Sequence, residues 1–397
     1  MSEGWHKDTL ANQLRHLSNH LDPSRNIMGR LEPSNPLAPQ AFRKDQRAKQ
    51  ARATINKTIP AILASDARAR NGVEAAELIS DPPPVEKGTS RRRSVPDDEG
   101  RVSSKPEVRL EVADTLSAAH RLSRKKGSVA ILNMASPLRP GGGVLNGATS
   151  QEESLCVRTT LLPTLKEEWY RLPDVGGIFS PGVCVFRLPD NDGETERELA
   201  KMERFHVGVV SAAMLRFPDV VEGDEGLRYA SEQDREMVSR KMRAVLRILK
   251  SKGVERVVLG AWGCGAYGNP VGEIARAWKR VILGSQKKAR VRDAGEIWYG
   301  LEEIVFAIKD RKIAEQFAVH WGPELEVENG RLPGSDVDDG DTDAQNELVS
   351  KIQELEIQVS QTQIPIVKER LENILSGLRA QLAETQPYKS VETQSPK

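Results

Sequence analysis

A chain of 397 residues with 38% apolar and 29% charged residues can bury one large core, but it is too polar to be packed throughout. Its 58 Lys and Arg side chains nearly balance 57 Asp and Glu side chains, so net charge gives no reason to expect direct nucleic-acid binding. The sequence has no apolar run long enough for a membrane span and no secretory signal, which predicts an intracellular protein, cytoplasmic or nuclear or both, with no membrane partner.

The N-terminal quarter divides into three segments of different character. Residues 1–40 are polar and interrupted by prolines, which predicts a weakly ordered arm. Residues 41–79 are rich in helix formers with isoleucines at helical spacing, and Pro60 must kink or end a helix there. Residues 81–106 are rich in Pro, Ser and charge, which predicts a disordered insertion.

The middle of the chain, up to residue 322, alternates strand-like and helix-like segments. The predicted strands are 108–113, 128–134, 183–188, 205–214, 256–262 and 303–308. The predicted helices are 114–125, 151–166, 232–252, 270–285 and 311–319. Several strands are apolar almost throughout and are therefore expected to be buried on both faces. This order predicts an α/β fold in three layers, α/β/α, around a mixed and mostly parallel sheet.

The C-terminal zone is expected to be separate from that fold. Residues 323–346 predict an acidic linker, and residues 347–384 carry two apolar stripes at helical spacing, which predict an amphipathic helical hairpin or coiled coil. Self-association through these helices and packing on the main domain both stay open. Residues 385–397 predict a disordered tail.

Cysteine and histidine placement gives no support for a metal or a cofactor. Cys156, Cys184 and Cys264 are odd in number and show no CxxC or Cys/His ligand spacing, so neither a disulfide framework nor a zinc site is expected. His206 lies within an apolar strand and is expected to be a core histidine rather than a catalyst.

The first segment that indicates chemistry follows the strand at 128–134. Three glycines, Gly141–Gly143, permit unusual backbone angles and a close approach to a ligand, although a bare glycine run is also an ordinary turn. Gln151, Glu152 and Glu153 follow at the start of a predicted helix, where Ser150 is placed to cap it. The helix dipole favours acidic residues there, so a capping role for the two glutamates is the structural alternative.

The second such segment follows the strand at 256–262. Four glycines, Gly260, Gly263, Gly265 and Gly268, lie between this strand and a helix with Pro270 near its first turn. A strand, a glycine-rich loop and a helix N-terminus together can bind a diphosphate, and open α/β sheets bind ligands at this end of their strands. Tyr267 could stack on a sugar or base.

The spacing of Gly141–Gly143 and Gln151–Glu153, read with "LNMA" upstream and "LGAWGCGAYGNP" downstream, resembles the microbial-type poly(ADP-ribose) glycohydrolases. The resemblance covers about residues 40–320 and is strongest at 129–165 and 205–275. It implies a macrodomain-like catalytic domain, here 41–322, with added N-terminal helices. The insertion at 81–106 and the C-terminal helices are not part of the family pattern.

The resemblance also implies roles for individual residues. Glu153 would be the catalytic residue, with Glu152 beside it. Glu152, Gln151 and Asn133 would hold the ribose that is cleaved. The remaining substrate-binding residues would contact ribose and diphosphate from the two loops: Gly142, Gly143, Val144, Gly263, Cys264, Gly265, Ala266, Tyr267 and Gly268. The family often has Phe where this chain has Tyr267.

The activity implied by the resemblance is hydrolysis of ribose–ribose O-glycosidic bonds, releasing ADP-ribose. Adjacent carboxylates can hardly straddle a sugar ring as the usual glycosidase pair does, so Glu153 alone is expected to act as acid and then as base. The expected partners are poly(ADP-ribose) or ADP-ribose and ADP-ribosylated proteins. Two alternatives stay open: a macrodomain that reads ADP-ribose without cleaving it, and a hydrolase of mono-ADP-ribosylated protein.

Overall fold

The computed structural model describes residues 39–85, 106–189, 196–224, 226–284, 296–328, 352, 355, 359 and 365–384. Most of the predicted N-terminal arm, the C-terminal tail, and most of the insertion at 81–106 and of the acidic linker lie outside these residues. The last two residues of the predicted arm, Pro39 and Gln40, begin a helix instead. In the described part of the chain, no helix is both long and apolar enough to cross a bilayer.

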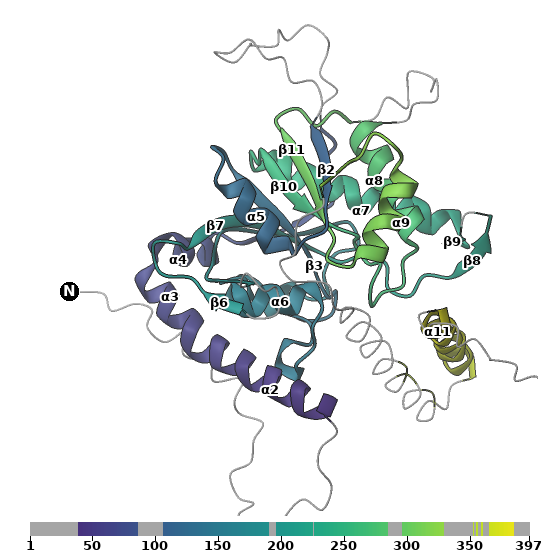
Figure 1. Ribbon diagram of the computed structural model, residues 1–397, viewed down its shortest axis with the longest axis horizontal. Helices are drawn as coiled ribbons and strands as arrows, with labels where there is room; N and C mark the ends of the chain where they lie inside the picture. Colours follow the sequence, from purple (N-terminus) through teal and green to yellow (C-terminus); the bar gives the residue numbers. More distant parts are fainter. Residues whose placement is uncertain are drawn as a thin grey trace, which may run out of the picture. The chain divides into compact units, whose positions relative to one another are not determined.

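An eight-stranded mixed sheet organises the fold (Figure 1). Its strand order is β1-β4-β7-β3-β10-β11-β2-β12. The pairings from β7 to β12 are parallel, whereas β4 pairs antiparallel with both β1 and β7. The strands are β1 (Glu77–Ser80), β2 (Glu107–Glu111), β3 (Val129–Met134), β4 (Gly176–Val185), β7 (Phe205–Ala212), β10 (Arg256–Leu259), β11 (Glu303–Ala307) and β12 (Glu326–Glu328).

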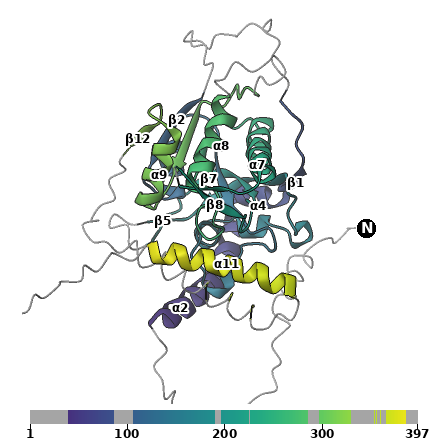
Figure 2. The same cartoon turned by 90° about the vertical axis from the view of Figure 1, so that its right-hand side faces the viewer.

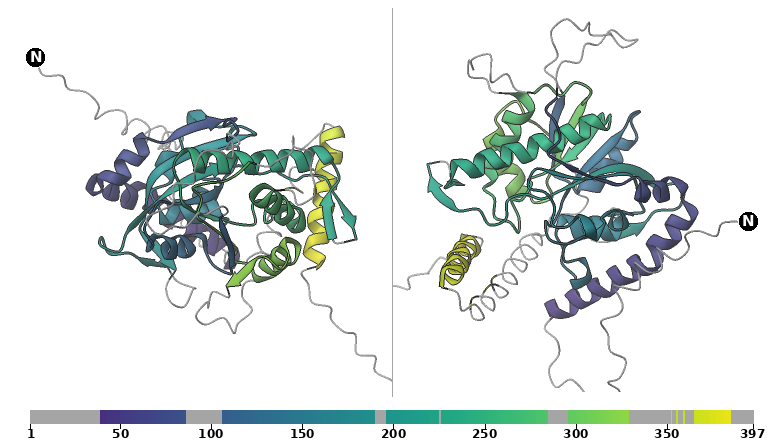
Figure 3. Two further views of the ribbon diagram at one scale, coloured as in Figure 1. Left: turned by 90° about the horizontal axis from the view of Figure 1, so that it is seen from above. Right: turned by 180° about the vertical axis from the view of Figure 1, so that it is seen from behind.

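Helices cover both faces of the sheet because alternate strand residues point to opposite sides. On β3, Ala130 and Leu132 pack in a cluster with α7 (Glu232–Ser251), α8 (Val271–Leu283) and α9 (Arg311–Trp321). Val129 and Ile131 pack in a second cluster with α5 (Thr115–Ser123) and α6 (Gln151–Arg158). The two groups of helices lie on opposite sides of the strands (Figure 3), so the predicted three-layer mixed α/β fold is confirmed.

The N-terminal helices follow the kink that Pro60 requires. Helix α2 (Pro39–Ala53) passes into a π-helical turn, Thr54–Thr58, before α3 (Ile59–Ser65) and α4 (Ala67–Glu74). Proline lacks the backbone N–H that would continue the helical ladder, so the register changes next to it. Ile59 and Ile62 then pack on Cys184 and Phe186.

Two elements around the first motif differ from the prediction. The helix predicted at 151–166 ends at Arg158, because Thr160 bonds instead to Cys184: the Thr160 N–H donates to the Cys184 carbonyl at 3.0 Å, and its hydroxyl accepts from the Cys184 N–H at 2.9 Å. Short 3₁₀ turns follow at Leu162–Thr164 and Glu167–Trp169. Strand β4 begins at Gly176, earlier than the strand predicted at 183–188, and has an irregular register between Ser180 and Val183.

Short elements that the sequence pattern did not predict complete the described part of the chain. They are the pair β5 (Arg187–Pro189) and β6 (Glu196–Glu198), the hairpin β8 (Val220–Gly223) and β9 (Gly226–Tyr229), and the edge strands β1 and β12. Each is only three or four residues long, so it carries little periodic signal.

The C-terminal zone contains one long helix, α11 (Pro365–Glu384; Figure 2). Leu375 and Leu378 on this helix form a buried cluster with Ile352 and Leu355, which are also helical. These contacts agree in kind with the predicted helical hairpin, which stays a prediction together with the other domain limits.

Candidate active site

The site is built where three neighbouring parallel strands end. β3 lies between β7 and β10, and all three run in the same direction, so the loops that follow them leave from one edge of the sheet. These loops are residues 135–150 after β3, 213–219 after β7 and 260–270 after β10. The two glycine-rich segments predicted from the sequence therefore lie at the same edge.

The first loop brings backbone against the two glutamates at the start of α6. The Glu153 carboxylate Oε1 accepts a hydrogen bond from the Gly143 N–H at 2.7 Å. Gly142 has φ +54°, and a Cβ there would lie 2.5 Å from Glu153 Oε1 and 2.9 Å from Glu152 Oε2. Only glycine provides both the left-handed conformation and the space, so the glycine run is a requirement of the carboxyl pair rather than an ordinary turn.

Gln151 fixes the start of α6 to the end of β3. Its amide oxygen accepts from the Met134 N–H at 2.8 Å, and its amide nitrogen donates to the Leu132 carbonyl at 2.8 Å. The same nitrogen donates to the Thr115 hydroxyl at 3.2 Å. Gln151 thus acts in this structure as the positioning residue for the two glutamates, and its predicted contact with a ribose stays a prediction.

The Glu152 carboxyl is buried behind Glu153. It is 3% exposed; Oε2 accepts from the Ser136 N–H at 2.8 Å, and Oε1 lies 3.5 Å from Asn133 Nδ2. Burial raises the pKa of Glu152 to about 8, and the neighbouring charge of Glu153 raises it further against the opposing hydrogen bonds. One proton therefore resides on this carboxyl pair at neutral pH.

The side-chain oxygen of Asn133, at the end of β3, is a buried hydrogen-bond acceptor. It is fully buried, and its Nδ2 donates to the Ser211 hydroxyl on β7 at 3.0 Å. Its Oδ1 has no hydrogen-bond partner within the described ranges. A buried acceptor left in this state is costly unless a ligand group satisfies it, which is consistent with the predicted ribose contact.

The second loop meets the first through Tyr267. A side-chain hydrogen bond links Tyr267 to Ser136, and the charges of Glu152 and Glu153 act on its phenol. Burial is the largest cause of the raised pKa of Tyr267. The two loops are therefore side by side at this edge, and the predicted contact of Tyr267 with a ribose stays a prediction.

The other predicted loop residues occupy this edge in different ways. Gly263 (φ +82°) and Gly268 (φ +67°) adopt left-handed backbone conformations, whereas Gly265 has open space where a side chain would be. Ala266 is half-buried. Val144 and Cys264 are 4% and 5% exposed, so they shape the loops from within.

A residue that sequence reasoning missed, Asn269, connects two of the three loops, 260–270 and 213–219. Asn269 donates from Nδ2 to the Leu215 and Gly263 carbonyls at 2.8 and 3.0 Å, and its Oδ1 accepts from the Tyr229 hydroxyl at 2.8 Å. Its position after the fourth glycine was the available signal: a buried amide beside a helix start is typical of a loop clasp.

The loop after β7 contributes a cation and an aromatic ring. The Arg216 guanidinium lies 5.3 Å from the Phe217 ring centroid and 6.0 Å from that of Tyr267. The Phe217 N–H donates to the Tyr267 carbonyl at 3.0 Å, and the two rings are 6.4 Å apart. No periodic pattern marks these residues in the sequence.

Two further features lie beside the glutamates. At the end of α6, Arg158 is 3% exposed and pairs with both oxygens of Asp114 at 2.7 and 2.9 Å. Tyr170 is close enough for the Glu152 charge to add to the burial that raises its pKa, and its hydroxyl has no hydrogen-bond partner in the part of the chain that the structure covers.

Comparison with known proteins agrees with this arrangement. The family model described as "Microbial-type PARG, catalytic domain" matches residues 82–188, which contain Asn133, the first glycine loop and the carboxyl pair. This segment is similar to the catalytic domain of microbial-type poly(ADP-ribose) glycohydrolases. The resemblance predicted from the sequence is thereby confirmed.

Solved structures show a similar fold. The poly(ADP-ribose) glycohydrolase of Thermomonospora curvata is 24% identical with a TM-score of 0.51, covering 70% of this chain and 99% of that chain. The enzyme of Deinococcus radiodurans in complex with ADP-ribose is 23% identical with a TM-score of 0.46, covering 64% of this chain and 96% of that chain. No curated protein sequence matches the chain. The likeness to the Thermomonospora curvata enzyme shows that the two chains share a fold.

Proposed function

We propose that this protein hydrolyses ribose–ribose O-glycosidic bonds in poly(ADP-ribose) and releases ADP-ribose, with Glu153 as general acid and base. One observation carries the proposal. A buried carboxyl pair at a helix N-terminus lies against a glycine backbone, at the sheet edge where a second glycine-rich loop also ends. The match to a poly(ADP-ribose) glycohydrolase catalytic domain over the same residues supports it.

In the proposed reaction, the Glu153 carboxyl gives up one proton and later takes one back. The Glu153 carboxyl donates its proton to the ribose oxygen that leaves, as the bond to the anomeric carbon breaks. Water then adds to the oxocarbenium-like carbon and gives its proton back to the Glu153 carboxylate. The group must therefore carry a proton before cleavage and none after it.

The carboxyl pair is suited to that cycle. Burial raises the pKa of Glu152 to about 8, so at neutral pH this carboxyl holds a proton, which must pass to Glu153 before Glu153 donates it to the leaving oxygen. Glu153 is the more exposed of the two, 8% against 3%, so it faces the substrate side while Glu152 lies behind it. The Gly143 N–H stabilises the ionised form of Glu153 once the proton has left.

The loops provide complementary contacts for an anionic sugar nucleotide. Gly265 and Gly268 have open space where a side chain would be, so a diphosphate could approach the backbone of the second loop closely. Arg216 adds a cation at the same rim, and Tyr267 offers a ring to a ribose. The unsatisfied Oδ1 of Asn133 would accept a ribose hydroxyl.

Substitution Glu153→Gln tests the proposal. It keeps the shape of the side chain and removes proton transfer, so release of ADP-ribose from defined polymer should fall by about 10²–10⁴-fold. Calorimetry should show that ADP-ribose still binds. Turnover close to that of the unmodified protein would refute the assignment of Glu153.

A matched control and two substrates separate the alternatives. Glu203→Gln makes the same chemical change at an exposed ion pair with Arg197 and should leave turnover unchanged. ADP-ribose binding by the unmodified protein without polymer cleavage would indicate a reader module instead. Cleavage of mono-ADP-ribosylated protein with intact polymer would indicate the other hydrolase class.

A further inference from the structure

A second cluster of reactive side chains lies away from the carboxyl pair, on the antiparallel side of the sheet. Cys184 on β4 and His206 on β7 are direct cross-strand partners. Asp66 immediately precedes α4, which packs on β4. The potential ligand atoms of these three residues all lie within 4.8 Å of one another. Nothing in the proposed hydrolysis uses them.

The three side chains already converge on one carboxylate. His206 Nε2 lies 2.7 Å from Asp66 Oδ2. The Cys184 thiol donates to the Val185 carbonyl at 3.9 Å, and the charge of Asp66 acts on it. Asp66 Oδ1 accepts from the Ala69 N–H at 3.0 Å and caps α4. One oxygen of Asp66 thus caps its helix, and the other contacts the His206 ring, within 4.8 Å of the Cys184 sulfur.

We propose that Asp66, Cys184 and His206 form a zinc-binding site. Thiolate, imidazole and carboxylate are the three ligand types that zinc takes in proteins, and Zn–N and Zn–S bonds of about 2.0–2.3 Å place tetrahedral ligands roughly 3.3–3.5 Å apart. In the structure, His206 and Asp66 are closer than this, at 2.7 Å, and all the potential ligand atoms lie within 4.8 Å of one another. Side-chain shifts of about 1 Å therefore complete the site.

Charge balance favours a divalent ion at this place. A Cys184 thiolate and the Asp66 carboxylate together offset the two positive charges, so a mostly buried site stays neutral. Binding breaks the thiol S–H bond, the sulfur electron pair binds zinc, and the proton goes to solvent. His206 Nε2 donates to the Asp66 carboxylate in this structure, so a neutral ring must pass that proton to Nδ1 through exchange with solvent before Nε2 binds zinc. The ring then releases no net proton, and one proton is released per zinc.

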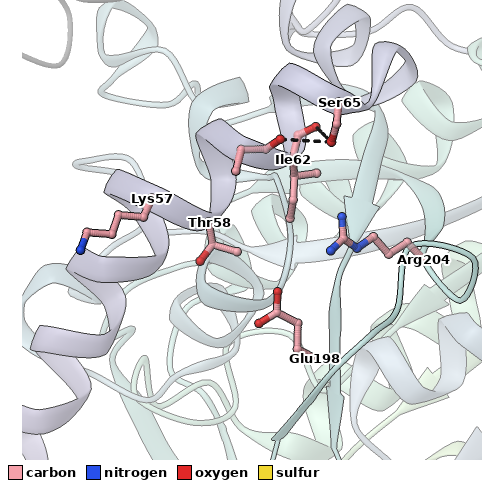
Figure 4. Close-up of a pocket in the computed structure, with 7 residues that line it drawn as sticks. Lys57, Thr58, Ile62, Ser65, Glu198 and Arg204 are labelled. Carbon is pink, nitrogen blue, oxygen red and sulfur yellow. Dashed lines mark hydrogen bonds between the residues drawn. The ribbon is translucent and has the colours of Figure 1, made fainter.

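The surroundings leave room for a water molecule as the fourth ligand. The Asp66 and His206 side chains are 21% and 17% exposed, whereas Cys184 is fully buried. Ile62 and Arg204 are among the residues that line a hollow of about 450 Å³ (Figure 4). Ile62 packs in the same cluster as Cys184, and the charge of Arg204 acts on its thiol. The partly exposed Asp66 and His206 side chains give an ion access to the cluster from solvent.

The site would fasten the N-terminal helices to the sheet. Asp66 belongs to the α3–α4 junction, while Cys184 and His206 belong to two adjacent strands. A metal bound to all three residues would link Asp66 to His206, which lies 140 residues further along the chain. Zinc binding should therefore raise the melting temperature of the whole domain.

Cobalt substitution tests the proposal on the full chain. The protein is freed of metal with a chelator and titrated with Co²⁺, whose absorption spectrum depends on its ligands. We expect saturation at one equivalent, with a thiolate-to-cobalt charge-transfer band, visible bands of a four-coordinate ion, and displacement of both by one equivalent of Zn²⁺. Titration without a thiolate band would overturn the proposal.

Variants then assign the ligands. Cys184→Ser should abolish the charge-transfer band, and His206→Gln should weaken Co²⁺ binding by about 10-fold or more. Cys156→Ala, which removes another buried thiol outside the cluster, should keep the band. Loss of the band in Cys156→Ala with its retention in Cys184→Ser would overturn the assignment. Circular dichroism confirms that each variant is folded, and the titration of the unmodified protein decides the proposal without them.

Discussion

The carboxyl pair and the Asp66–Cys184–His206 cluster lie on the same sheet but are built in opposite ways. Glu152 and Glu153 are adjacent in sequence and are presented by a loop at the ends of parallel strands. The cluster joins three distant positions through the register of two antiparallel strands and a helix cap. Parallel strand ends gather loops, whereas antiparallel register pairs individual side chains.

The electrostatics of the two regions also differ in sign. Burial and like charge raise the pKa of Glu152, so folding works against its ionisation. For Asp66, burial is outweighed by the Ala69 N–H and the His206 ring, which lower its pKa. The raised pKa of Glu152 therefore lowers the free energy of unfolding at neutral pH, as is common for ionisable groups at functional sites. The lowered pKa of Asp66 raises the free energy of unfolding.

The largest effect on stability is expected where α6 is anchored behind the carboxyl pair. Arg158→Met removes a buried guanidinium and leaves the half-buried Asp114 without its partner, although that guanidinium holds the pKa of Asp114 down against burial. Urea unfolding should show a loss of about 3–5 kcal/mol. Arg197→Met breaks an exposed pair with Glu203 and should cost less than about 1 kcal/mol. Equal losses in the two variants would contradict the difference in burial.

Glu152→Gln should stabilise the fold, and more so as pH rises. With a folded pKa of about 8 against 4.5 for the exposed group, the unmodified protein loses stability between these pH values, because the unfolded chain releases the proton first. The variant should be more stable by on the order of 3 kcal/mol at pH 7 and nearly equal at pH 4. Denaturant unfolding across this range measures the difference.

A pH-independent difference would show that Glu152 is ionised in the fold and would remove the contrast between the two regions. The activity of the unmodified protein provides an independent check, because turnover that needs the proton on the pair should decline above a pH of about 8.

Asp66→Ala should reduce stability by about 1–2 kcal/mol in chelator, because it removes both a helix cap and the partner of His206. Asp66→Asn keeps the cap and should lose roughly half as much. Since the folded pKa of Asp66 is lowered, its contribution is present above the unfolded value and disappears as pH falls. Melting curves of both variants at pH 7 and pH 3 test this, and an effect that grew at low pH would contradict it.

The smallest effect is expected at Tyr170. Its buried hydroxyl lacks a partner in the described ranges, so Tyr170→Phe should leave stability unchanged or raise it by up to about 1 kcal/mol. Tyr229→Phe is the matched control: its hydroxyl donates to Asn269 at 2.8 Å, and the variant should lose about 1–2 kcal/mol. Thermal unfolding compares them, and a greater loss at Tyr170 would reveal a partner for its hydroxyl.

Much of the fold and of the candidate site could be predicted because the signal is local. The apolar runs 128–134 and 256–262 each lead into glycines, and this order alone predicts loops at the carboxyl ends of buried strands. The short strands β1 and β12 and the early end of α6 could not be predicted. Their pairing depends on distant segments, such as Cys184 with Thr160.

Sequence by itself determined which residues are chemically capable: the glycine runs, the adjacent Glu152 and Glu153, and the alternation of strands and helices. Only the tertiary structure decided that Gln151 positions these glutamates, that Asn269 joins the loops, and that Cys184, His206 and Asp66 converge. The reason is physical: backbone conformation follows from neighbouring residues, whereas burial, pKa and side-chain partners are set by segments that approach only when the sheet forms.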